Sequence, residues 1–200
     1  MNHQEQGNGL AIEGAAVSGG VGVFEGAEAD GFYTVVCIGK DGEVKWEDTI
    51  HNVVCTEGKN SAFQAIFKAS AFTSTVYMGL IGNVSYTAPA ATGTAAAIAT
   101  AASANSWNEA AAATSAARAA PSFAVPSAGA VSLSAARTFS MLAADTINGC
   151  FVLITSVALV APTSVVAATT GALWSAGAFT GGAKVVANGD TLNVSYTASM

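Results

Sequence analysis

Residues 32–50 read FYTVVCIGKDGEVKWEDTI, two runs rich in β-branched and aromatic residues on either side of Asp41-Gly42. Such a pair of runs around an Asp-Gly dipeptide predicts a β-hairpin. A three-residue loop, Lys40 to Gly42, with the glycine in the left-handed conformation, pairs Ile38 with Val44. A two-residue type I′ turn instead sets Ile38 against Lys45 and separates polar from apolar side chains less well. The three-residue loop is therefore the favoured interpretation.

Regular pairing from that loop outward predicts which face of the hairpin enters the core. It sets Val36 opposite Trp46 and Phe32 opposite Ile50, while Lys45 and Glu47 fall on the wetter face. The predicted core side chains of the hairpin are Phe32, Val36, Ile38, Val44, Trp46 and Ile50.

The segment after the hairpin changes from strand to helix periodicity. Residues near 58–70 carry Phe63, Ile66 and Phe67 at helical spacing, which predicts a short amphipathic helix with this stripe in the core. Residues 73–88 return to strand chemistry, with Gly79 and Gly82 as bulges or close approaches. Residues 89–120 are rich in alanine without a large apolar stripe, so we interpret them as a loop leading into an edge strand rather than a helix.

From residue 131 onward, short strand-like runs alternate with turns such as INGC at 147–150 and TGG at 180–182. In residues 190–199, Leu192, Val194 and Tyr196 alternate with hydroxyl and amide side chains, as in a half-buried strand. The sequence NVSYTA occurs at 83–88 and again at 193–198, and two equivalent strands in two sheets would explain the repeat. The predicted fold is mainly β, an antiparallel β-sandwich of jelly-roll or Ig-like type with one short helix.

The N-terminal residues 1–31 form a glycine-rich arm, and residues 32–200 form the sandwich domain. Glycine at this density makes an isolated backbone costly to order, which is typical of a disordered terminus. Small apolar islands favour a second interpretation, in which the arm becomes ordered on another subunit. The candidate interface residues of the arm are Leu10, Ile12, Val23 and Phe24.

Charge is distributed very unevenly along the chain. Of its 20 charged side chains, 14 lie between the N-terminus and Lys68, and the charged fraction of 10% is well below the roughly 25% of an average soluble domain. A surface of Ala, Ser, Thr and Gly is easily covered, because few charges need partners and little side-chain entropy is lost. We therefore expect an interface-rich β-domain, and the alternative is a monomer with a hydroxyl-rich surface. The net charge of −6, without a basic cluster, argues against nucleic-acid binding.

Residues that could carry chemistry are few and badly placed for it. His51 and Cys55 are four apart on a predicted strand, too far separated to share a metal ion, and the predicted pairing puts Cys37 opposite Lys45, far from His51. Many serines are present, but none lies in a nucleophile elbow with a His-Asp partnership. The sequence predicts no enzyme activity, no cofactor and no metal site. The N-terminus has no signal-peptide pattern, and the longest apolar run, 150–161, is too short for a membrane helix, so we expect a soluble protein.

Several segments resemble a family of small tailed-bacteriophage virion proteins. The resemblance covers about residues 34–198, and its most specific parts are Trp46, Asp48, Asn52 and Val54 in KWEDTIHNVV and the closing GDTLNV. The chain departs from the family pattern between Trp107 and Pro121, where it has an alanine tract. Members of this family are known as structural or head-decoration (cement) proteins.

The resemblance implies a non-enzymatic particle protein. The first hypothesis is a decoration protein on the capsid exterior, made in the bacterial cytoplasm, that binds the major capsid protein as a dimer or trimer. The second is a protein associated with the tail or a fibre. The third is a receptor- or carbohydrate-binding module that uses Trp107, Trp174 and Tyr196.

Overall fold

The structure is a computed structural model, and the residues it describes are 29–68, 75–96, 109–110, 120–155 and 171–200. The arm residues Leu10, Ile12, Val23 and Phe24 lie outside the described residues. The same holds for Trp107 and for most of the alanine-rich stretch predicted as a loop.

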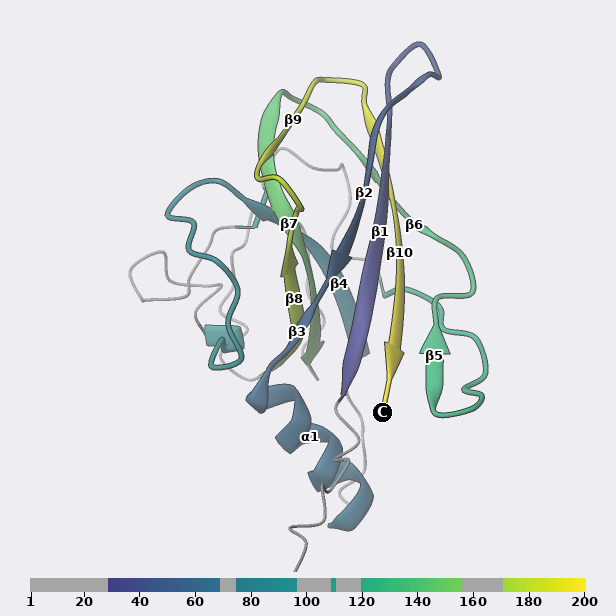
Figure 1. The fold of residues 1–200 in the computed structure, drawn as a ribbon, viewed down its shortest axis with the longest axis vertical. Helices are drawn as coiled ribbons and strands as arrows, with labels where there is room; N and C mark the ends of the chain where they lie inside the picture. Colours follow the sequence, from purple (N-terminus) through teal and green to yellow (C-terminus); the bar gives the residue numbers. More distant parts are fainter. Residues whose placement is uncertain (1–28, 69–74, 97–108, 111–119, 156–170) are drawn as a thin grey trace, which may run out of the picture.

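In the described part of the chain, the strands form two five-stranded sheets in which every pairing is antiparallel (Figure 1). The first sheet has the order β2-β1-β10-β5, and β6 also pairs with β10. The second has the order β3-β8-β7-β4, and β9 also pairs with β7. This arrangement confirms the predicted mainly β, antiparallel sandwich.

The bounds of the elements follow the predicted runs in most places. The first sheet contains β1 (Asp30–Ile38), β2 (Val44–His51), β5 (Ala130–Ser132), β6 (Arg137–Ser140) and β10 (Thr191–Ser199). The second contains β3 (Val53–Val54), β4 (Thr75–Gly82), β7 (Asp145–Thr155), β8 (Ala172–Ala178) and β9 (Lys184–Val186). Within the described residues, the α-helix α1 (Thr56–Phe67) follows β3.

The two ends of the sandwich differ in character. The β1–β2 loop projects at one end, whereas α1, the start of β1 and the C-terminus lie at the opposite end (Figure 1). We call these the hairpin end and the helix end. The charges of residues 40–43 are therefore far from the exposed apolar side chains of α1.

The main core lies between the sheets, and a second cluster covers the outer face of the second sheet. Tyr33, Val35 and Leu192 belong to the first, and Phe151 and Leu153 belong to the second. Residues of β7 therefore face apolar surroundings on both sides. This explains why residues 150–154 read as an unbroken apolar run instead of alternating.

The hairpin has the predicted loop but not the predicted register beyond it. Gly39 and Glu43 close a loop of Lys40 to Gly42, Gly42 has φ of 88°, and Ile38 pairs with Val44. The register then shifts, so that Cys37 pairs with Trp46 and Lys45 is left as the extra residue of a β-bulge.

Because strand side chains alternate between faces, this one-residue bulge exchanges the predicted inner and outer faces of β1. The face of β1 that enters the core carries Tyr33, Val35 and Cys37, which are fully buried. The core prediction was thus wrong for Phe32 and Val44, which are exposed, and for Val36 and Ile38, which are only partly buried. Two residues of the set do contribute: Ile50 is buried, and Trp46 is partly buried against the core.

The helix prediction was right in kind and wrong about its buried face. The helix occupies Thr56–Phe67, close to the predicted 58–70, but Phe63, Ile66 and Phe67 are exposed instead of packed in the core. The helix approaches β8 through its first turn. A Cβ atom on Gly58 would lie 2.6 Å from the Trp174 Cα atom, so this close approach requires glycine.

The predicted turn at INGC was also wrong, because residues 147–150 lie inside β7. Gly149 serves close packing there: a Cβ atom on it would run into the carbonyl oxygen of Gly177 on the neighbouring strand. The TGG turn is present, with Gly181 and Gly182 at positive φ.

The two copies of NVSYTA are not equivalent in structure. The second copy lies in β10, but the first begins after β4 has ended at Gly82 and forms a turn with Ser85 at a φ of 53°. The interpretation of the repeat as two matching strands was therefore wrong. The roles predicted for Gly79 and Gly82 are confirmed, since Gly79 lies against the Phe151 ring and the register shifts beside Gly82.

Candidate apolar binding groove

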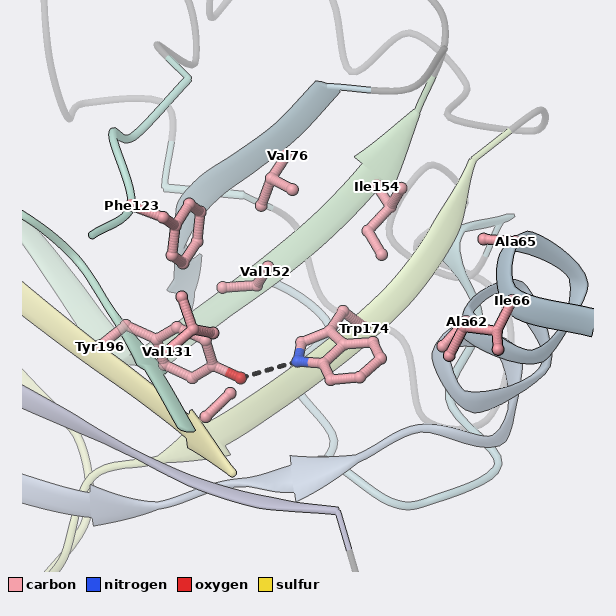
Figure 2. Close-up of a pocket in the computed structure, with 11 residues that line it drawn as sticks. Ala62, Ala65, Ile66, Val76, Phe123, Val131, Val152, Ile154, Trp174 and Tyr196 are labelled. Atoms are coloured by element: carbon pink, nitrogen blue, oxygen red, sulfur yellow. Dashed lines mark hydrogen bonds between the residues drawn. The ribbon is translucent and has the colours of Figure 1, made fainter. Parts of the chain in front are cut away.

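An apolar groove opens at the helix end, where α1 approaches the edge between the two sheets. Its volume is about 360 Å³, within the usual range for small-molecule and side-chain sites. Figure 2 shows side chains from α1 on one side and from β4, β7, β8 and β10 on the others. The lining residues are Ala62, Ala65, Ile66, Val76, Phe123, Val131, Val152, Ile154, Trp174, Tyr196 and Ala198.

The polar atoms of Trp174 and Tyr196 are already engaged with each other. The Trp174 indole N–H donates to the Tyr196 hydroxyl oxygen at 2.8 Å, drawn as a dashed line in Figure 2, and Asn52 Nδ2 donates to the same oxygen at 3.2 Å. Burial raises the pKa of Tyr196, so the phenol stays neutral. Since the other lining side chains are hydrocarbon, the described wall of the groove suits apolar side chains and offers little to a polar ligand.

The rim of the groove continues into exposed apolar surface on α1. Phe63, Ile66 and Phe67 are 58%, 64% and 75% exposed, and the two phenylalanine rings lie 5.9 Å apart between centroids. Single exposed apolar residues are ordinary, but three adjoining ones beside an apolar hollow are typical of a protein-binding surface. We call Phe63, Ile66 and Phe67 the helix stripe.

Titratable and hydroxyl side chains outside the groove, such as Tyr33 and Asp48, make structural contacts. The Tyr33 hydroxyl lies 2.6 Å from Ser175 Oγ and joins the two sheets, and burial raises its pKa well above the usual value. Asp48 on β2 lies 3.2 Å from Lys184 Nζ on β9, which links the sheets at the hairpin end. None of these contacts aligns a nucleophile with a base in an open cleft, which is what covalent catalysis needs.

The three cysteines are buried as free thiols. Burial raises the pKa of Cys37 to about 11 and that of Cys55 to about 12, so neither is a thiolate at neutral pH. Cys37, Cys55 and His51 do not come together, and the described residues contain no group of three side chains suited to hold a metal ion.

The structure does not bring the predicted site residues together. The predicted hairpin core lies on β1 and β2 and contributes nothing to the groove, and the candidate arm residues lie outside the described part. Trp174 and Tyr196 do meet in the groove, although Tyr196 is 2% exposed. The signal available in the sequence was the helix stripe, whose short helix has no second apolar face.

Comparison with protein-family models, with curated proteins and with solved structures finds no match in any of the three. The structure therefore defines the class of fold, an antiparallel two-sheet β-sandwich, and the groove has to be interpreted from its own geometry. No helix within the described residues is long and apolar enough to cross a membrane.

Proposed function

We propose that this protein is a non-enzymatic virion structural protein, which binds the outside of a bacteriophage capsid as a decoration or cement protein. The resemblance over residues 34–198 suggests the family. The observation that carries the proposal is the exposed helix stripe of Phe63, Ile66 and Phe67 beside the apolar groove. A protein that works by docking onto a lattice needs such a surface, whereas it needs no catalytic group.

The distribution of charge gives the docked protein an orientation. The loop residues Lys40, Asp41 and Glu43 are exposed at the hairpin end, opposite the helix stripe (Figure 1). Interface cores are depleted in charge and enriched in aromatic side chains. In the proposed complex the helix end therefore contacts the major capsid protein or a neighbouring copy in a dimer or trimer, and the hairpin end faces water.

The two other hypotheses receive different support. A tail- or fibre-associated protein would use the same surface, so only its location on the particle distinguishes it. A carbohydrate-binding module is not favoured, because sugars require hydrogen-bonding groups around an aromatic platform. The polar atoms of Trp174 and Tyr196 already bond to each other.

The decisive experiment measures binding to expanded, emptied capsids that lack this protein. The wild-type chain should bind with defined stoichiometry, and Phe63→Ser/Ile66→Ser/Phe67→Ser should lose binding while remaining folded. Val185→Ser is the matched control, because Val185 is 70% exposed on β9, away from the helix end. Absence of wild-type binding to capsids, or density confined to the tail in electron micrographs of particles, would overturn the capsid assignment.

A further inference from the structure

The polypeptide enters the sandwich beside the apolar groove. At the start of β1, Asp30 pairs with Ser199 and Gly31 pairs with Ala198, and Ala198 lines the groove. Paired strands lie about 4.8 Å apart. The start of β1 therefore lies beside the groove wall, at the same end as α1 (Figure 1), and the arm is attached to the sandwich there.

The nearest apolar cluster in the preceding sequence is VGVF at residues 21–24. Residues 25–29, EGAEA, separate it from β1. Six residue steps from Phe24 to Asp30 span at most about 20 Å when extended. Phe24 and Val23 can thus reach the groove of their own chain without any change in the sandwich.

We propose that Val21, Val23 and Phe24 dock in the apolar groove of their own chain. The chemistry of the two surfaces matches: the described wall presents hydrocarbon and aromatic side chains, and the segment offers two β-branched side chains and one aromatic ring. Gly20 and Gly22, on either side of Val21, lack side chains and would let the docked backbone pass close to α1. A tethered segment also has a high effective concentration at a site so close to its attachment point.

A buried acceptor lies where the arm joins the sandwich. Asn52 is 4% exposed, and its Oδ1 atom has no hydrogen-bond partner among the described residues. A Cβ atom on Gly31 would lie 3.2 Å from this oxygen, so the acceptor is beside the second residue of β1. Buried acceptors are nearly always paired. A backbone N–H of the docked arm would supply the missing donor.

This docking divides the arm into two parts with different roles. Val21 to Phe24 would cover the groove and the part of Ile66 that lines it, and Phe63 and Phe67 of the helix stripe would remain available for a partner. Leu10 and Ile12 lie nine or more residues nearer the N-terminus than Val21. They would be free to reach a neighbouring subunit. The inference concerns the chain's own groove and stands whether or not the protein decorates a capsid.

The test measures how fast a thiol in the groove wall reacts with a small neutral maleimide, using the full chain throughout. Val131→Cys places the thiol on a partly buried wall residue, and Ala62→Cys on α1 is a second position should the first variant fail to fold. The native cysteines add little background because all three are buried. The labelling rate of each wall variant is measured in three backgrounds. The first is the otherwise wild-type chain, the second carries Val21→Ser/Val23→Ser/Phe24→Ser, and the third carries the matched control Leu10→Ser/Ile12→Ser.

The proposal predicts that the Val21, Val23 and Phe24 substitutions raise the labelling rate about tenfold, equivalent to about 1.4 kcal/mol of docking free energy. The Leu10 and Ile12 substitutions should leave the rate unchanged. Equal rates in all three backgrounds would overturn the proposal, because the groove would then be open or filled by another part of the chain. A protected thiol that becomes reactive on dilution would show that a second copy supplies the segment, which also overturns docking within one chain.

Discussion

Lys45 Nζ lies 2.6 Å from Asp190 Oδ2, and this ion pair spans the whole width of β1 between β2 and β10. Lys45 is the extra residue of the hairpin bulge, and Asp190 immediately precedes β10. The same carboxylate accepts a hydrogen bond from the Ala187 N–H at 2.8 Å. The bulge that changes the hairpin register therefore also directs a cation onto a carboxylate that is 4% exposed.

The first prediction concerns acid stability. Burial alone would raise the pKa of Asp190, but the hydrogen bonds from Lys45 and Ala187 hold it below the usual value. Its contribution to stability should therefore be fully present above the unfolded-state pKa of about 3.9 and be lost as pH falls through the lower folded-state pKa. In Lys45→Met the burial effect remains while a stabilising donor is gone, so destabilisation should begin at higher pH.

Thermal unfolding of the two proteins between neutral and strongly acidic pH checks this shift. Glu47→Gln is the control, because Glu47 is an exposed carboxylate on the same strand. Superimposable pH profiles for Lys45→Met and the wild type would show that the ion pair does not set the charge state of Asp190.

The second prediction tests which face of the hairpin is buried. Val35→Ala should cost about 2 kcal/mol, since two buried methyl groups are removed and a cavity is left. Val44→Ala should cost about 0.5 kcal/mol or less, because Val44 is 59% exposed. Urea unfolding gives both free energies. If Val44→Ala proves the more costly, the register lacks the bulge and the regular pairing is right.

The sequence predicts most of the secondary-structure elements correctly. It does not predict the register or the close approach of neighbouring strands. Alternation and Asp41-Gly42 predict the strands and the hairpin loop, because these depend on local chemistry. The bulge places Lys45 against a long-range partner, Asp190, that no local pattern contains. For the same reason Gly149 looks like a turn residue, and the neighbouring Gly177 that requires it is distant in sequence.

The candidate site was less predictable than the fold. Helical spacing places Phe63, Ile66 and Phe67 on one side, but periodicity does not tell whether another element covers that side. The groove itself is formed by residues from six elements and a loop, including Phe123 and Val131, which carry no distinguishing pattern. Only the three-dimensional arrangement brings them together.

The third prediction concerns the close approach of β7 and β8. Gly149→Ala should cost at least about 3 kcal/mol or prevent folding, because the new Cβ atom meets a backbone carbonyl that cannot easily move. Gly181→Ala should cost only about 1 to 2 kcal/mol, the penalty of a left-handed alanine, since the space around Gly181 is open. Denaturant unfolding compares them. Similar costs for the two variants would contradict the packing between these strands.

The fourth prediction concerns the thiols. At pH 8 a water-soluble disulfide reagent should modify none of the native cysteines in the folded protein and all three in denaturant, because each is buried and Cys37 and Cys55 have raised pKa values. Their contribution to stability should be present below the unfolded thiol pKa of about 8.5 and decline as pH rises toward about 11 to 12. Val185→Cys, on an exposed site, is the positive control and should react at once. Rapid modification of a native thiol would contradict this prediction, because it would show that the structure burying that thiol opens readily.

The last prediction concerns the orientation of the proposed complex and uses salt. If the uncharged helix stripe makes the contact, affinity for capsids should change little between about 0.05 and 0.5 M salt, because screening acts on charges. Lys40→Ala/Glu43→Ala, at the opposite end, should bind like the wild type. A contact through the charged hairpin would behave differently. Salt screens exposed ion pairs, so binding that depends on them should weaken steeply as ionic strength rises. Capsid co-sedimentation across this salt range measures both proteins. Loss of binding at moderate salt, or release of the folded hairpin variant at low salt, would reverse the orientation and make the hairpin end the docking surface.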